Sequence, residues 1–197
     1  MQLTYKPMGE YQTNCYILSI NEKDIIIDPG IGATSWVKEN VKNPVAILNT
    51  HGHFDHVWSN AELKEIFNIP IMIHQKDAFL LEMDQYHMGM PKSKADILID
   101  NEDLINLDDF SFRFLHFPGH TPGCCVIEFE EAWFSGDFIF RGSIGRVDFP
   151  YSSPEDMKKS LIRFKNIPYD KPVYPGHGPS TTIKTEQKYV DYWLRAI

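Results

Sequence analysis

Cysteine is scarce in this chain of 197 residues, which has only Cys15, Cys124 and Cys125. An odd number of cysteines, two of them adjacent, does not make a disulfide framework and indicates a reducing compartment. The sequence also lacks an apolar run of membrane-spanning length, and residues 1–6 contain no basic segment that leads into an apolar one. These absences predict a cytoplasmic protein with no export signal and no membrane contact.

Positive charge is scarce as well. The chain has 19 Lys and Arg against 27 Asp and Glu, and its formal net charge is −8. Broad binding to nucleic acid depends on neutralising phosphates with Lys and Arg, so this balance argues against a nucleic-acid partner. A small anionic substrate remains possible, because a local pair of metal ions can outweigh the negative electrostatic potential of the whole protein.

The length predicts one domain, residues 1–197, with enough chain to bury a core. The first half alternates strands and helices, which predicts at least one parallel strand pair. Its expected strands are 13–20, 24–28, 44–50 and 69–74, and its expected helices are 34–42, 59–67 and 76–83. The second half is rich in strands, at 104–107, 111–117, 124–130, 132–135 and 171–174, with helices at 153–166 and 183–194.

Polar residues mark where these helices should begin. We expect Thr34 or Ser35 to cap the first helix and Ser59 to cap the second. Ser153 should cap a third helix, with Pro154 at its first position.

Residues 86–95 are rich in Met, Gly, Pro and Lys and predict a mobile loop. We expect ordinary packing for Tyr86, Met88 and Met90, with the lining of a substrate entrance as the alternative. Cys124 and Cys125 fall on a predicted strand and are expected in the core.

Histidine and aspartate are concentrated in one run of the form H-x-H-x-D-H. It consists of His51, His53, Asp55 and His56 and directly follows the strand expected at 44–50. Composition alone would produce such a run in roughly one chain in a thousand. Three imidazoles this close would repel one another if protonated, so their coexistence favours a metal site. Imidazole and carboxylate together suit zinc, with iron or manganese as alternatives.

Three later segments each offer one further ligand beside glycine. They contain His120 between Gly119 and Thr121, Asp137 after Gly136, and His177 after Gly176. A surface or hydrogen-bonded histidine is the alternative for His120 and for His177 taken singly. Ligands in α/β sheets gather beyond the carboxyl ends of strands, where the first run already stands. The four segments together therefore predict a two-metal hydrolytic site.

These motifs in this order resemble the metallo-β-lactamase superfamily. The resemblance extends from residues 13–16 to residues 176–178 and includes Asp28 in the segment Ile-Asp-Pro-Gly. It implies an α/β fold, a four-layer αββα sandwich with the metals at one edge of the two sheets.

The resemblance also implies which side chains hold two divalent metal ions. One ion would be held by His51, His53 and His120, the other by Asp55, His56 and His177, and Asp137 would bridge them. Asp55 would also orient the nucleophile. Asp28 would lie behind the ligands, where a carboxylate can fix a histidine tautomer.

Within the superfamily, members that hydrolyse antibiotics with a cysteine ligand carry it where Asp137 stands, which argues against an antibiotic role. Residues 136–146 are similar to single-domain relatives of the type II glyoxalases, which hydrolyse hydroxyacyl-glutathione. That similarity implies that Arg146 holds a glutathione carboxylate. The sequence departs from the two-domain glyoxalases at Asp148, where they have a tyrosine, and it does not contain their C-terminal helical extension.

The function expected is hydrolysis of a thioester such as S-lactoylglutathione by attack of metal-bound hydroxide. The alternatives are a mononuclear-iron persulfide dioxygenase and a lactonase. A non-catalytic, metal-stabilised interaction domain is the outside case, and open coordination positions argue against it.

Overall fold

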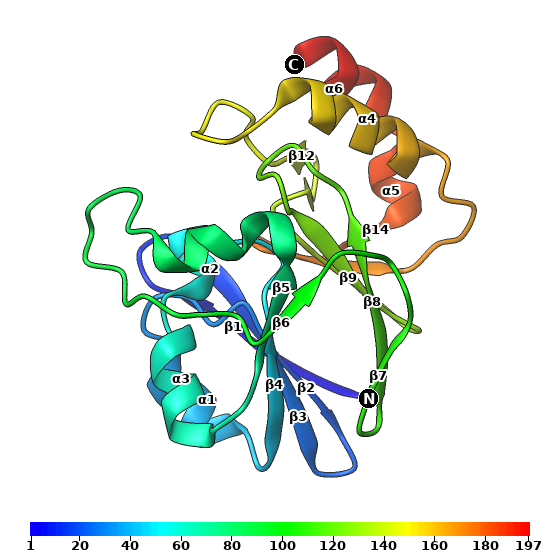
Figure 1. The fold of residues 1–197 in the computed structure, drawn as a ribbon. Coiled ribbons are helices and arrows are strands. Elements are labelled where there is room, and N and C mark those ends of the chain that lie inside the picture. Colours follow the sequence, from blue (N-terminus) through cyan, green and yellow to red (C-terminus); the bar gives the residue numbers. More distant parts are fainter.

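A computed structural model describes residues 1–197 as two six-stranded sheets that pack face to face, with helices on the outer faces (Figure 1). The first sheet follows the chain in the order β1-β2-β3-β4-β5-β6. Its strands are β1 (Gln2–Met8), β2 (Thr13–Ile20), β3 (Lys23–Ile27), β4 (Pro44–Leu48), β5 (Ile71–His74) and β6 (Ile97–Ile99). The strands β3 to β6 pair in parallel, which confirms the expected parallel pairing.

The second sheet has the order β14-β13-β10-β9-β8-β7. Its strands are β7 (Ile105–Leu107), β8 (Phe110–His116), β9 (Cys125–Phe129), β10 (Trp133–Gly136), β13 (Pro172–Pro175) and β14 (Thr181–Thr182). A short hairpin of β11 (Ile139–Phe140) and β12 (Ser143–Ile144) stands apart from it. Along β8 the residues Phe110, Phe112 and Phe114 are buried while Ser111 and Arg113 are exposed, because successive side chains of a strand point to opposite faces.

Three apolar layers hold the sheets and helices together. One lies between the two sheets and includes Leu18, Leu48 and Phe114. A second lies under α1 (Ala33–Asn40), α3 (Asn60–Phe67) and η1 (Gln75–Glu82), and a third under α4 (Pro154–Lys165), α5 (Ile183–Gln187) and α6 (Val190–Ala196). The order helix, sheet, sheet, helix confirms the predicted αββα sandwich (Figure 1).

Some element predictions were wrong in detail. Residues 75–82 form a 3-10 helix rather than an α-helix, and the last helix is interrupted between Gln187 and Val190. The strand β1 was not predicted, because most of its side chains are exposed and it carries little apolar pattern. The segment between Glu82 and Ile97 has no helix or strand, as expected of a loop.

Of the predicted helix caps, one is confirmed and the others are wrong. The helix α1 begins after Gly32, so the prediction of Thr34 or Ser35 as its cap was wrong. Ser59 precedes α3, but its hydroxyl donates to a backbone carbonyl elsewhere instead of capping the helix. The prediction for Ser153 is confirmed, since its hydroxyl oxygen accepts a hydrogen bond from the amide of Asp156.

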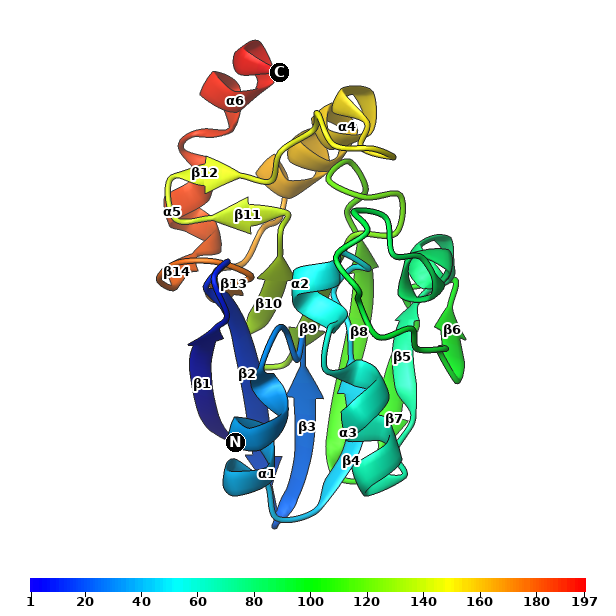
Figure 2. The ribbon, with the colours of Figure 1, turned by 90° about the vertical axis from the view of Figure 1, so that its left-hand side faces the viewer.

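Strands from both sheets end at one edge of the sandwich. Figure 2 shows β3 and β10 pointing toward the end of the molecule where α2 (Phe54–Val57) and the β11–β12 hairpin lie. Side chains just beyond the carboxyl ends of strands therefore meet there. None of the helices is long and apolar enough to cross a lipid bilayer.

Candidate metal centre

The H-x-H-x-D-H run forms the link between β4 and α2. His51 and His53 lie in the loop after β4, and Asp55 and His56 lie in the single turn of α2. All four side chains are buried, with His51 and His56 fully so. The run thus supplies four polar groups that face the interior at the sheet edge.

The three later segments arrive at the same place from the second sheet. His120 lies in the turn between β8 and β9, Asp137 directly follows β10, and His177 follows β13. His120 and Asp137 are buried, while the His177 side chain is 30% exposed. The structure therefore brings together all seven residues that the sequence singled out as ligands.

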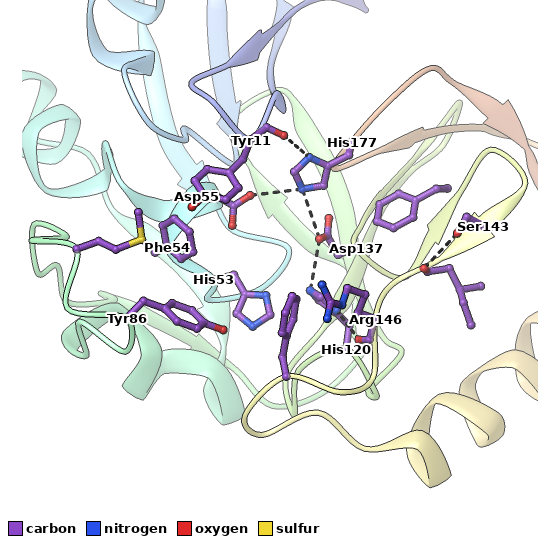
Figure 3. Close-up of a pocket in the computed structure, with 14 residues that line it drawn as sticks. Tyr11, His53, Phe54, Asp55, Tyr86, His120, Asp137, Ser143, Arg146 and His177 are labelled. Atoms are coloured by element: carbon purple, nitrogen blue, oxygen red, sulfur yellow. Dashed lines mark hydrogen bonds and ion pairs between the residues drawn. The ribbon is translucent and has the colours of Figure 1, made fainter. Parts of the chain in front are cut away.

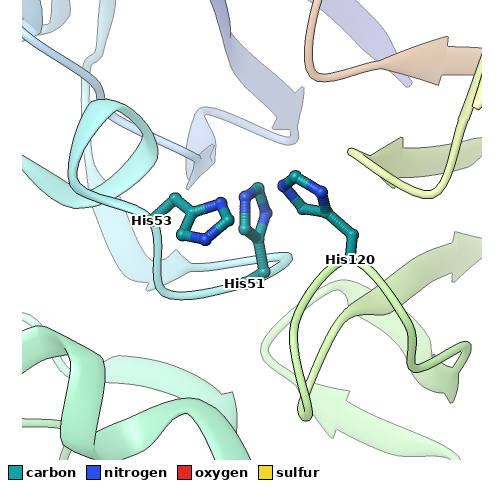
Figure 4. Close-up of side chains that lie close together, drawn as sticks. All are labelled: His51, His53 and His120. Carbon is teal, nitrogen blue, oxygen red and sulfur yellow. The ribbon is translucent and has the colours of Figure 1, made fainter. Parts of the chain in front are cut away.

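Within this cluster the first set of side chains is His51, His53 and His120 (Figure 4). One ring nitrogen of each lies within 4.8 Å of those of the other two. The ring centroids of His53 and His120 are 4.5 Å apart, and the Nε2 atoms of all three are buried without a hydrogen-bond partner. Buried nitrogens that converge and lack a partner are what a metal ion requires.

The second set is Asp55, His56 and His177, whose ligand atoms also lie within 4.8 Å of one another. His56 Nε2 is 3.5 Å and His177 Nε2 is 3.4 Å from Asp55 Oδ2. This set matches the second metal position that the family resemblance implied.

Asp137 lies between the two sets. Its Oδ2 atom is 3.4 Å from His120 Nε2 and 3.5 Å from His177 Nε2 (Figure 3). Its Oδ1 atom is 3.3 Å from His56 Nε2. A carboxylate whose oxygens contact both sets can bridge two cations. Gly176 makes room for it, because a Cβ at that position would collide with the Asp137 carboxylate and the His56 ring.

The protonation states of the cluster suit cation binding. Burial and the neighbouring His56 hold the pKa of His51 well below its usual value, and burial with His120 lowers the pKa of His53 to about 3. Burial raises the pKa of Asp55, but His56 and His177 outweigh it and lower that pKa to about 2. Neutral imidazoles thus stand beside an ionised carboxylate.

The carboxylates in turn draw positive charge into the second set. Burial lowers the pKa of His56, but Asp55 and Asp137 outweigh it and raise that pKa well above its usual value. Burial likewise opposes ionisation of His177, yet hydrogen bonds to Asp137 and Asp55 raise its pKa to about 9. A divalent cation would supply this charge instead and leave both imidazoles free to coordinate.

Asp28 organises the ligands from behind. Its carboxylate accepts hydrogen bonds from His56 Nδ1 at 3.0 Å and from the amide and hydroxyl of Thr50 at 2.8 and 2.6 Å. Because the Thr50 hydroxyl donates to Asp28, its oxygen accepts from His51 Nδ1 at 3.1 Å. Both histidines therefore present Nε2 to the cluster. The family resemblance implied this position behind the ligands for Asp28.

Backbone carbonyls fix two more histidines. His120 Nδ1 donates to the carbonyl of Arg146 at 2.8 Å, and His177 Nδ1 donates to the carbonyl of Tyr11 at 3.0 Å. In each ring Nε2 is left to face Asp137. The loop that carries Arg146 therefore supports the cluster through its main chain.

Asp77 is a supporting residue that the sequence analysis missed. This fully buried carboxylate accepts hydrogen bonds from the Gly52 amide at 3.0 Å, the Thr121 hydroxyl at 2.6 Å and the Gly123 amide at 2.5 Å. It therefore ties the His51–His53 loop of one sheet to the His120 loop of the other. Burial raises its pKa to about 6 although these hydrogen bonds lower it.

The cluster opens into a cavity of about 610 Å³ (Figure 3). Tyr86 and Met88 from the loop before β6 line it, whereas Met90 is buried in the apolar layer beneath α3. The packing prediction is therefore right for Met90 and wrong for Tyr86 and Met88. Cys124 and Cys125 are fully buried free thiols in the core, as expected.

Arg146 also lines the cavity, but its guanidinium already has a partner. Its Nε and Nη2 atoms donate to the two carboxylate oxygens of Asp148 at 2.9 and 2.7 Å. The expected contact between Arg146 and a substrate carboxylate stays a prediction, and it would compete with this pair.

A family model for the metallo-beta-lactamase superfamily matches residues 8–177. Together with the αββα fold and the clustered ligands, this match shows that the chain belongs to the metallo-β-lactamase superfamily of metallo-hydrolases, whose His and Asp cluster indicates divalent metal binding.

Individual relatives are similar along nearly the whole chain. Hydroxyacylglutathione hydrolase GloC of Haemophilus influenzae is 38% identical, over 95% of this chain and 96% of that protein. Among solved structures, the BLEG-1 B3 metallo-beta-lactamase is 32% identical with a TM-score of 0.88, over 98% of this chain and 99% of that one. TTHA1623, solved in a di-iron-bound form, is 35% identical with a TM-score of 0.81, over 93% of this chain and 96% of that one.

Proposed function

We propose that this protein is a hydrolase of thioesters, of the glyoxalase II type, with a two-metal centre. The observation that carries the proposal is the position of Asp137, whose carboxylate lies between the two ligand sets and contacts His120 of one and His56 and His177 of the other. A bridged pair of cations is suited to hydrolysis rather than to one-metal oxygen chemistry. The similarity to hydroxyacylglutathione hydrolase GloC supports a thioester substrate.

We assign the ligands as the family resemblance did. One ion is held by His51, His53 and His120, the other by Asp55, His56 and His177, with Asp137 shared. We propose zinc, with iron as the alternative that the di-iron form of TTHA1623 favours. When bound, two divalent cations supply the Lewis acidity that ionises water near neutral pH and polarises a carbonyl group.

The protein's own groups position the reactants. The Thr13 hydroxyl donates to Asp55 Oδ2 at 2.6 Å, which fixes the carboxylate that we assign to orienting the attacking water. The aromatic side chains Tyr11 and Phe54 line the cavity beside it. A leaving thiol ionises near pH 8.5, so the site needs no general acid for it.

Hydrolysis of β-lactams is a second candidate, and the similarity to BLEG-1 favours it. The aspartate at position 137 argues only against lactamases that use a cysteine ligand. A lactam nitrogen is a poorer leaving group than a thiolate, and no cavity residue outside the metal ligands offers it an acidic proton except the tyrosines. We therefore rank thioesters first.

We further propose that residues 1–197 act as one domain in the cytoplasm. The three cysteines are buried free thiols, which suits a reducing compartment.

Elemental analysis followed by a substrate panel tests the proposed function. We expect about two ions per chain and turnover of S-lactoylglutathione that a chelator abolishes and added Zn²⁺ or Fe²⁺ restores. The panel should include nitrocefin, a homoserine lactone, and glutathione persulfide with an oxygen electrode. One iron per chain with oxygen uptake would replace the hydrolase by a dioxygenase, and activity on nitrocefin alone would replace it by a lactamase.

A further inference from the structure

The wall of the cavity carries almost no charge outside the proposed metal ligands. Besides those ligands, nine residues line the cavity, and seven of them are aromatic or aliphatic, among them Tyr11, Phe54 and Phe140. The other two are Ser143 and Arg146. Arg146 is therefore the only cationic side chain in the cavity wall outside the proposed metal ligands.

The charge of Arg146 is cancelled where a substrate would pass. The guanidinium forms a two-pronged ion pair with Asp148, and its Cζ atom lies over the Phe149 ring at 4.3 Å from the ring centroid. The Phe149 ring in turn lies beside His53 and His120, at 5.8 and 6.0 Å between centroids. The Phe149 ring thus separates the Arg146–Asp148 ion pair from the two histidine ligands. Figure 3 shows Arg146 beside His120.

We propose that Asp148 makes this cavity selective for thioesters whose thiol portion carries no carboxylate. The two-pronged bond occupies the Nε and Nη2 edge of the guanidinium, so a substrate carboxylate must either displace Asp148 or bind the remaining Nη1 edge beside an acid that already neutralises the charge. An apolar or uncharged thiol portion contacts only the aromatic residues of the cavity wall, so its binding does not compete with Asp148. The net charge of −8 adds no attraction for an anion.

The inference rests on the proposed thioester hydrolysis and narrows it. Both side chains of the pair are about two-thirds exposed, at 64% for Arg146 and 65% for Asp148, so the pair is a modest barrier and not a block. We therefore expect glutathione thioesters to be turned over, with a KM that Asp148 raises.

Matched ligands and a matched variant test this assignment. S-lactoylglutathione and its diethyl ester have the same acyl group and backbone, and the ester lacks free carboxylates. In Asp148→Asn, the ratio of kcat/KM for the free acid to kcat/KM for the ester should rise about twofold to fivefold, through KM of the free acid. Asp191→Asn is the control, because it removes another exposed ion pair, with Lys165, on the helical layer of the second sheet; its ratio should stay at the wild-type value.

Binding separates this inference from the proposed function. S-hexylglutathione and its diethyl ester are not hydrolysed, so calorimetry on the metal-loaded protein measures their affinity even if no thioester is turned over. We expect Asp148→Asn to tighten binding of the free acid about twofold to fivefold relative to the ester. A ratio that stays unchanged or falls, in turnover or in binding, would overturn the role of Asp148, whereas absent thioester turnover with the expected binding shift would overturn only the proposed activity.

Discussion

Replacing Asp137 by alanine should reduce kcat for thioester hydrolysis by roughly three orders of magnitude or more. The Asp137 carboxylate approaches both ligand sets, with His120 on one side and His56 and His177 on the other. Without it, the two cations would repel each other with no shared anion between them. Steady-state kinetics and the metal-to-protein ratio after dialysis measure the effect, and we expect fewer than two ions per chain.

A stability measurement accompanies this prediction, because a buried aspartate also affects the fold. The Asp137→Ala protein should keep its circular dichroism spectrum, since its carboxylate contacts only the ligand cluster. Full turnover by a variant that holds a single ion would contradict the assignment of Asp137 as a bridge.

Replacing Asp77 by alanine should lower both the free energy of unfolding and the metal affinity. The substitution leaves the amides of Gly52 and Gly123 and the hydroxyl of Thr121 without their acceptor in the interior. Each unpaired buried group costs about 1–3 kcal/mol, and we expect a total loss of about 3 kcal/mol after water enters the space. Denaturant unfolding of the metal-free protein measures this loss.

Metal affinity distinguishes positioning from stability alone. Asp77 holds the loops of His51, His53 and His120 in register, so its removal should weaken the first metal site about tenfold to a hundredfold in a chelator competition on folded protein. Asp77→Asn keeps the side-chain volume and one acceptor oxygen and should fall between wild type and Asp77→Ala. An alanine variant with normal metal affinity and a stability loss below about 1 kcal/mol would contradict this role.

The ligand positions were predictable because they follow local rules. The H-x-H-x-D-H run follows a buried strand, and His120, Asp137 and His177 stand beside glycines in turns. The carboxyl ends of the strands meet at one edge of the sheets. Residues that directly follow a strand in the sequence could therefore be predicted to lie close together at that edge. The alternation of strands and helices predicted the parallel strand pairing, whereas the four-layer sandwich was implied by the family resemblance.

Asp77 was not predictable from such rules. Its three contacts span 25, 44 and 46 residues, and no glycine or turn pattern surrounds it in the 3-10 helix η1. A lone aspartate in an amphipathic segment predicts an exposed helical face. Only the packing of two loops from different sheets around one carboxylate reveals its function.

Arg146 was singled out from the sequence, but its surroundings were not. The departure at Asp148 was visible in the sequence, whereas the two-pronged pair depends on the turn after β12 folding the two side chains onto each other. A spacing of two residues does not determine whether charges of opposite sign meet. The structure therefore changed the interpretation of Arg146 from a free anion binder to a neutralised one.

Anomalous diffraction from a crystal of the metal-loaded protein tests the two-metal centre most directly. We predict two peaks per chain at the absorption edge of the bound metal, one among His51, His53 and His120 and one among Asp55, His56 and His177, with an Asp137 oxygen toward each. A map with a single peak or none, and with the ring of His120 or His177 turned away from Asp137, would contradict the two-metal centre.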